Sequence, residues 1–149
     1  MFLSIVCSSY KEEVLPDGES RVVLSLPAVL APIKACIMPL VRKDGLPEKA
    51  QEVLNMLKYD FKVAYDEKDS IGKRYRRQDA IGTPLCITID HDTMQDNCVT
   101  IRNRDTMQQE RVPIAEVYAK VAKEASFSEI YKKIADWIWL KNVPDVAKK

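Results

Sequence analysis

A mixed-sign cluster around one aromatic ring is the stretch of this chain best suited to chemistry. Its charged and aromatic members are Glu67, Asp69, Lys73, Arg74, Tyr75, Arg76, Arg77 and Asp79. Arginine and lysine bind phosphate oxygens, arginine also stacks on bases, and a tyrosine ring offers a further stacking surface. The cluster therefore suits an unpaired RNA loop, and a solvated basic helix face is an equally weighted alternative.

The rest of the chain is nearly neutral, which makes this concentration of cations local. The sequence has 23 basic and 22 acidic residues and a formal net charge of +1. Such a balance predicts neither nonspecific nucleic-acid binding nor attraction to membranes, so any polyanion must bind at a patch. Arg102 and Arg104, followed by Asp105, form a second charged cluster.

Sequence motifs for catalysis are absent. The chain contains no GxGxxG, GxxxxGK[ST], HExxH or GxSxG string, and its four glycines are too few for the usual phosphate loop. The single histidine, His91, lies between Asp90 and Asp92 in a polar stretch, where a solvated side chain is more common than a metal ligand. We predict no catalytic residue and no metal ligand, and favour recognition over catalysis.

Length and composition indicate one soluble domain. A chain of 149 residues with 46% hydrophobic content can bury a single core. No apolar run approaches the roughly 20 residues that span a bilayer, so we expect no membrane association. Cys7, Cys36, Cys86 and Cys98 are spaced singly, which predicts reduced, buried thiols in a cytoplasmic protein.

Hydrophobic periodicity and turn residues predict the elements that must position these side chains. Expected strands lie at 33–41, 61–65, 84–90, 98–102 and 106–112, with 91–97 as a turn or loop. Expected helices lie at 1–10, 47–57, 71–81, 114–125 and 128–140, and 11–26 is expected to be a hairpin or a linker strand. Ser70 is placed to cap the helix at 71–81. The order predicts an α/β fold, a mixed five-stranded sheet flanked by helices in three α/β/α layers.

Several long strings carry a family resemblance. They are Leu-Pro-x-x-Leu-Ala-Pro-Ile-Lys at 26–34, the stretch 65–84 that contains Ile-Gly-Lys-Arg-Tyr-Arg-Arg-Gln-Asp, Thr-Ile-Arg-Asn-Arg-Asp-Thr-Met at 100–107, and Arg-Val-Pro at 111–113. Together they resemble the C-terminal anticodon-binding domain of bacterial glycyl-tRNA synthetases of the dimeric class II type. The resemblance covers about residues 1–116, and no motif of the family matches 117–149.

The resemblance implies a function for a longer parent protein. That parent would be a cytoplasmic homodimer that uses ATP and Mg²⁺ to join glycine to tRNA-Gly, with no role for DNA. Residues 1–26 would be a helix and linker strand from the end of the catalytic domain, 27–125 the anticodon-binding domain, and 126–149 a C-terminal helix and tail. This chain alone is then expected to need no cofactor and to catalyse nothing. A synthetase-like interaction or regulatory domain without catalysis is the alternative.

The resemblance also suggests roles for individual residues. Glycine anticodons end in two cytosines, whose N4 amine donates and whose N3 and O2 accept. The carboxylates of Glu67, Asp69 or Asp79 would accept from N4, Arg74, Arg76, Arg77 or Arg104 would contact acceptor edges or phosphates, and Tyr75 or Arg102 would stack. On a helix, Lys73, Arg76 and Arg77 share a face that Arg74 does not, so some cations must be structural. Asp79 would equally pair with Arg76 or Arg104.

Overall fold

The computed structural model describes residues 2–16, 18–127, 131, 132 and 135. Most of the predicted helix at 128–140, with Trp137 and Trp139, lies outside the described residues. The helices are α1 (Phe2–Ser9), α2 (Leu46–Leu57), α3 (Ile71–Ile81), α4 (Thr93–Asp96) and α5 (Ile114–Ala125). The strands are β1 (Tyr10–Val14), β2 (Ser20–Leu24), β3 (Ala35–Pro39), β4 (Val63–Tyr65), β5 (Leu85–Ile89), β6 (Cys98–Asn103) and β7 (Gln109–Pro113).

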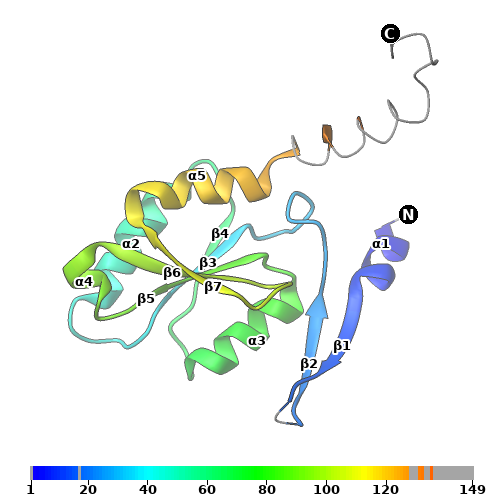
Figure 1. Ribbon diagram of the computed structural model, residues 1–149, viewed down its shortest axis with the longest axis horizontal. Coiled ribbons are helices and arrows are strands. Elements are labelled where there is room, and N and C mark those ends of the chain that lie inside the picture. The colour runs from blue at the N-terminus through cyan, green and yellow to red at the C-terminus, as the bar shows by residue number, and fades with distance from the viewer. Residues whose placement is uncertain (1, 17, 128–130, 133–134, 136–149) are drawn as a thin grey trace, which may run out of the picture.

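The central sheet has the order β4-β3-β5-β6-β7, as the prediction of a mixed five-stranded sheet required. Strands β4, β3 and β5 are parallel to one another, because helices connect them. Strand β6 is antiparallel to β5, and β7 is antiparallel to β6. Figure 1 shows the helices on both sides of this sheet. The predicted three-layer α/β/α architecture is therefore confirmed.

Alternation along the central strands divides their side chains between two buried layers. Ala35 and Ile37 of β3 join the larger core with apolar side chains of α2 and α5, whereas Cys36 and Met38 face the layer of α3. All five residues of β3 and all five of β5 are buried. Strands buried on both faces are often continuous apolar runs in the sequence, as the segment of β3 is.

Helix α3 ends at a glycine that lets another segment approach. Gly82 has φ 89°, and a Cβ built on it would meet the Leu24 carbonyl oxygen of β2 at 3.0 Å. The start of α3 is as predicted at Ser70, although the Ser70 hydroxyl makes no capping hydrogen bond. Glycine at this position thus ends the helix and allows β2 to pack against it.

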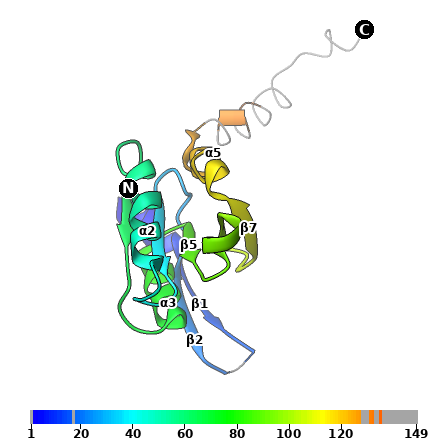
Figure 2. The same cartoon turned by 90° about the vertical axis from the view of Figure 1, so that its left-hand side faces the viewer.

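The N-terminal region forms a helix and a two-stranded hairpin beside α3. Residues 10–14 and 20–24 pair as antiparallel strands, with Tyr10 opposite Leu24, so of the two predictions for 11–26 the hairpin is the one observed. Figures 1 and 2 show this hairpin on the side of the molecule occupied by α3, away from α5. Within the described residues, no helix is long and apolar enough to cross a membrane.

Three local predictions were wrong. Residues 91–97, expected as a turn or loop, contain the four-residue helix α4, and Tyr10 begins a strand rather than ending a helix. All four cysteines are free as expected, and Cys36 and Cys86 are buried, but Cys7 is exposed and Cys98 is half-buried. Burial raises the pKa of the Cys36 thiol to about 12 and also raises that of Cys86, so these two thiols stay protonated.

Candidate nucleic-acid interface

Helix α3 carries the basic string and separates its members by direction. Arg74 is buried, Tyr75 is half-buried, and Lys73, Arg76 and Arg77 are exposed. This is the division expected from 100° of rotation per residue, because positions 73, 76 and 77 share a face that position 74 does not. The basic string therefore has one cation in the protein interior and three at the surface.

On the inner side of α3 lies a buried arginine network made of Arg21, Asp79, Arg102 and Arg104. Asp79 is fully buried, and the two terminal nitrogens of Arg102 donate to its two carboxylate oxygens at 3.0 and 3.1 Å. Arg21 Nε lies 3.5 Å from the same carboxylate. A buried carboxylate needs such compensation, so these partners hold β6 and the hairpin to α3.

Arg104 extends the buried arginine network through backbone carbonyls. Its two terminal nitrogens donate to the carbonyl oxygens of Gly82 and Leu26, each at 2.7 Å. Arg21 in turn donates to the carbonyl oxygen of Arg104 at 2.7 Å. Arg104 is 2% exposed, which leaves it no surface at which to meet a ligand.

These contacts correct the pairing expected for Asp79. Its partners are Arg102 and Arg21, and neither Arg76 nor Arg104 binds it. Burial also argues against direct RNA contacts by Asp79, Arg74 and Arg104, because each already has protein partners and is no more than 3% exposed. The sequence alone does not reveal the long-range partner Arg102, which lies 23 residues away from Asp79.

Tyr75 and Arg102, predicted as base-stacking residues, stack on each other. The Arg102 guanidinium carbon lies 4.8 Å from the centre of the Tyr75 ring. The Tyr75 hydroxyl lies 2.7 Å from the Thr88 hydroxyl of β5 in a hydrogen bond, and burial raises the Tyr75 pKa. This stacking is a cation–π contact within the protein, and it orients Arg102 toward Asp79.

A second charged region lies where β3 and β4 end. We call it the carboxyl-end surface: a pocket of about 490 Å³ lined by Leu40, Val41, Arg42, Lys43, Glu67, Asp69 and Arg74. The chain leaves β3 toward α2 on one face of the sheet and leaves β4 toward α3 on the other. Diverging loops at the carboxyl ends of parallel strands leave a crevice between them, and ligands of open α/β sheets bind there.

Glu67 presents a carboxylate to this pocket from a fixed position. The Tyr65 hydroxyl donates to its Oε2 at 2.8 Å, and the Tyr65 pKa is raised to about 12 by burial and by this hydrogen bond. Arg42 Nε donates to the backbone oxygen of Glu67 at 2.9 Å and lies 3.8 Å from its Oε1. The Glu67 side chain is 37% exposed and is therefore accessible to a ligand.

Arg77 holds the loop that carries Glu67 and Asp69. It donates to Asp66 at 2.5 Å and to Asp69 at 2.6 Å, and these hydrogen bonds raise its pKa. Asp69 has φ 69°, a left-handed conformation that non-glycine residues adopt only when their surroundings fix it. Arg76 pairs instead with Glu19 of the hairpin turn, and in the described part of the chain Lys73 makes no ion pair.

The prediction from sequence missed Arg42 and Lys43. Both follow β3, and the side chain of Arg42 is 58% exposed. Their signal was positional, because the first charged residues after a buried parallel strand lie at the binding edge of an α/β sheet. Across the residues that the structure describes, no three histidine, cysteine or acidic side chains gather in a way that would hold a metal ion.

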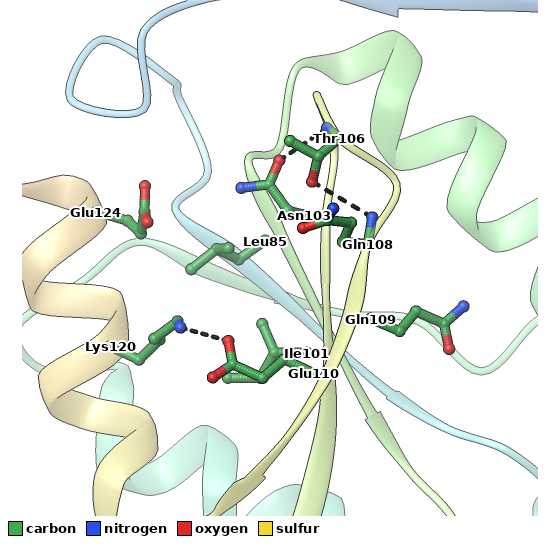
Figure 3. A pocket seen from close by; sticks show the side chains of 9 residues that line it. All are labelled: Leu85, Ile101, Asn103, Thr106, Gln108, Gln109, Glu110, Lys120 and Glu124. Carbon is green, nitrogen blue, oxygen red and sulfur yellow. Dashed lines mark hydrogen bonds and ion pairs between the residues drawn. The ribbon is translucent and has the colours of Figure 1, made fainter.

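A second pocket, of about 420 Å³, lies at the opposite end of β5 (Figure 3). It lies between α5 and the β6–β7 hairpin, over Leu85 and Ile101. Its charged lining consists of Glu110, Glu124 and Lys120, and Lys120 is already paired with Glu110 at 2.5 Å. A net negative lining repels phosphate, so the carboxyl-end surface is the better RNA candidate.

Comparisons with known proteins agree with this architecture. A family model described as Anticodon binding domain matches residues 34–124. The glycine–tRNA ligase of Borrelia hermsii is 49% identical over 82% of this chain and 27% of its own length, and that of Macrococcus caseolyticus is 52% identical over 78% of this chain and 25% of its own length. The chain thus spans about a quarter of the length of these relatives.

A solved structure shows the same fold. Prolyl-tRNA synthetase from Cryptosporidium parvum matches 79% of this chain and 24% of its own, with a TM-score of 0.63 and 22% sequence identity. At that identity the likeness concerns the fold of the sheet and its helices.

Proposed function

The chain belongs to the anticodon binding domain family, and from this premise we propose that it recognises the anticodon loop of tRNA-Gly as part of a glycine–tRNA ligase. Identities of 49 and 52% to two proteins of that name support the choice of glycine. The parent would be a cytoplasmic homodimer that binds ATP and Mg²⁺ outside this chain. In the proposed division, 1–26 is a helix and hairpin from the end of the catalytic domain, 27–125 is the anticodon-binding domain, and 126–149 is a C-terminal helix and tail.

The carboxyl-end surface is the observation that carries the proposal. It brings two exposed cations, Arg42 and Lys43, into one pocket with two exposed carboxylates, Glu67 and Asp69. The exposed edge of cytosine combines the N4 amine donor with the N3 and O2 acceptors, so it matches a carboxylate with a cation nearby, whereas uracil has the acceptor O4 in place of the amine. The phosphates on either side of the base are negatively charged, and the other exposed cations would neutralise them.

The proposed roles follow exposure. Glu67 and Asp69 accept hydrogen bonds from cytosine N4, and Arg42, Lys43, Lys73 and Arg76 neutralise phosphates. Arg77 keeps the loop of Glu67 and Asp69 in place. Arg74, Tyr75, Asp79, Arg102 and Arg104 contribute by holding α3 and the strands together rather than by touching RNA.

A binding measurement with matched variants tests the proposal. The 149-residue chain is titrated with a fluorescent glycine anticodon stem-loop and with versions in which either cytosine of the anticodon is replaced by uracil. The test variant is Arg42→Ala, Lys43→Ala, Lys73→Ala. The control is Lys58→Ala, Lys62→Ala, Lys123→Ala, which removes the same charge from exposed positions elsewhere.

The expected result is selective binding of the glycine stem-loop, which the test variant loses and the control keeps. Each lost phosphate contact should also make the salt dependence shallower by about 0.7 in log–log slope for single-stranded RNA. Equal affinity for all three stem-loops would contradict anticodon recognition and would favour an interaction module. An equal loss in both triple variants would contradict the location of the site.

Catalysis by the isolated chain is expected to be absent. The chain corresponds to about a quarter of its relatives, and we propose that the ATP-dependent steps reside in the remainder. Aminoacylation assays with glycine, ATP, Mg²⁺ and tRNA-Gly should therefore show no product above background.

A further inference from the structure

Arg74 occupies an unusual position for a member of a basic string. Arg74 is 3% exposed, and its guanidinium donates to backbone oxygens instead of carboxylates. Nη1 donates to the carbonyl oxygen of Pro39 at 2.6 Å and to that of Asp66 at 3.3 Å. Nη2 donates to the carbonyl oxygen of Leu40 at 3.1 Å.

These three oxygens belong to the two loops that form the carboxyl-end surface. Pro39 ends β3 and Leu40 follows it, two residues before Arg42, and Asp66 follows β4, directly before Glu67. Arg74 itself lies on α3, one residue after Lys73. One planar side chain therefore joins three segments, each of which carries an exposed charge proposed to meet RNA.

We propose that Arg74 is a positioning residue that sets the separation of these two loops and thereby determines discrimination between anticodon bases. The inference rests on the proposed function of the carboxyl-end surface. Arg74 acts through the loops, because it lines the pocket but is only 3% exposed. Arg77 supports one of the same loops from outside through Asp66 and Asp69, so the loop is held on both sides.

Arginine is needed because of the shape of its fork. Nη1 alone donates to both segments, at Pro39 and Asp66, and Nη2 adds the carbonyl oxygen of Leu40 in the same plane. A lysine ammonium is a point charge on a flexible stem, so it does not hold these three oxygens in one fixed planar arrangement. Arg74 Nε is buried and lacks a hydrogen-bond partner in the described structure. Lysine would remove that unpaired donor, and a role confined to folding predicts that Arg74→Lys leaves the ratio of stem-loop affinities unchanged.

Arg104 supplies a matched control. It is also a buried arginine that donates to two backbone carbonyls, those of Gly82 and Leu26, and it pairs in addition with Asp105, but these partners lie outside the carboxyl-end surface. Arg74→Lys and Arg104→Lys therefore each replace a buried guanidinium by an ammonium, but only the first change lies between the loops of the carboxyl-end surface. Stem-loop affinities are measured at a temperature at which circular dichroism shows both variants fully folded.

The readout is the ratio of affinities for the glycine stem-loop and its cytosine-to-uracil versions. We expect Arg74→Lys to lower this ratio about tenfold, the loss of one good base contact, while Arg104→Lys changes it less than about twofold. An Arg74→Lys ratio equal to that of the wild-type chain, or an equal fall in both variants, would overturn the inference.

A separate outcome concerns the proposed function itself. If the wild-type chain showed no preference among the stem-loops, anticodon recognition would fail before Arg74 was tested. If Arg74→Lys proves unfolded, the same ratio of stem-loop affinities is measured for Arg74→Met and Arg104→Met. These measurements use the full chain in a stabilising osmolyte. The two ideas are thus refuted by different results.

Discussion

The buried arginine network and the carboxyl-end surface use the same residue types in opposite ways. In the network, Asp79 has no exposed area and accepts hydrogen bonds from both terminal nitrogens of Arg102. At the surface, Arg42 and Glu67 are 58% and 37% exposed and lie 3.8 Å apart. The first arrangement holds elements together, whereas the second leaves its charges available. Burial, rather than the density of charge in the sequence, separates structural arginines from candidate RNA ligands.

The largest expected effect is on the network side. Asp79→Asn leaves Arg102 as an uncompensated buried charge and leaves Arg21 with only the partly exposed Glu13, so we expect a loss of about 3–5 kcal/mol in the free energy of unfolding. Urea denaturation measures it. The control Asp69→Asn breaks an exposed pair with Arg77 and should cost no more than about 1 kcal/mol. Equal losses of unfolding free energy in the two variants would show that the buried arginine network stabilises the fold no more than the exposed pair does.

The next largest effect is expected at the carboxyl-end surface, in the preference for cytosine over uracil. Glu67→Gln replaces a carboxylate acceptor by an amide that both donates and accepts, so uracil O4 becomes as acceptable as cytosine N4. The preference for cytosine should fall by about 1–3 kcal/mol in stem-loop titrations, with unfolding free energy nearly unchanged. The exposed Glu116→Gln on α5 is the control, and an identical loss in it would indicate a nonspecific charge effect.

A third prediction concerns Asp90, which is intermediate in burial between the two regions. Burial alone would raise its pKa, but hydrogen bonds from Arg111 and Thr93 outweigh that and lower the pKa to about 2. Because the folded pKa is depressed, the stabilisation is present above the unfolded value near 3.8 and disappears as pH falls through about 2.

The measurement compares Asp90→Asn with the wild-type chain by urea denaturation across pH. With a third of Arg111 exposed to solvent, we expect a difference of about 1 kcal/mol at pH 7 that shrinks toward zero near pH 2. A difference that stays constant across this range would show that Asp90 stabilises the fold by packing and not by charge.

The smallest effect is expected at Lys73. Lys73→Ala removes one exposed cation and should reduce the salt slope of stem-loop binding by about 0.7, with stability changed by no more than about 0.5 kcal/mol. Salt titrations between low and physiological ionic strength measure the slope. Lys62→Ala, on the loop before β4, should leave it unchanged. A reversed order of these two variants would locate the RNA on another face.

Most of the fold was predictable because periodicity reports burial directly. The apolar run at 33–41 and the alternation at 84–90 predicted β3 and β5, and the repeat through Ala50, Val53 and Leu57 predicted α2. The helix α4 was missed because four residues contain barely one helical turn, too short for any period to show.

The candidate site was only partly predictable. The spacing of 73, 76 and 77 indicated that Arg74 differs from its neighbours, but not that Arg74 would bind carbonyls 34 and 35 residues earlier. Likewise, the pairing of Asp79 with Arg102 depends on β6 lying next to β5, which is a property of strand order. Periodicity describes each element by itself, and pairing between elements arises from tertiary structure.

The bond from Arg21 to the Arg104 carbonyl has a consequence for synthesis on the ribosome. The two residues are 83 positions apart, so the hairpin emerges well before its anchor exists. At about 5–20 residues per second, the delay is about 4–17 s, far longer than the microseconds in which a hairpin forms. Until α3 has been synthesised β2 cannot pack against it, and throughout the interval β2 lacks its anchor at Arg104. Among the strand pairs of this chain, the hairpin is therefore the earliest to be synthesised and among the last to be secured.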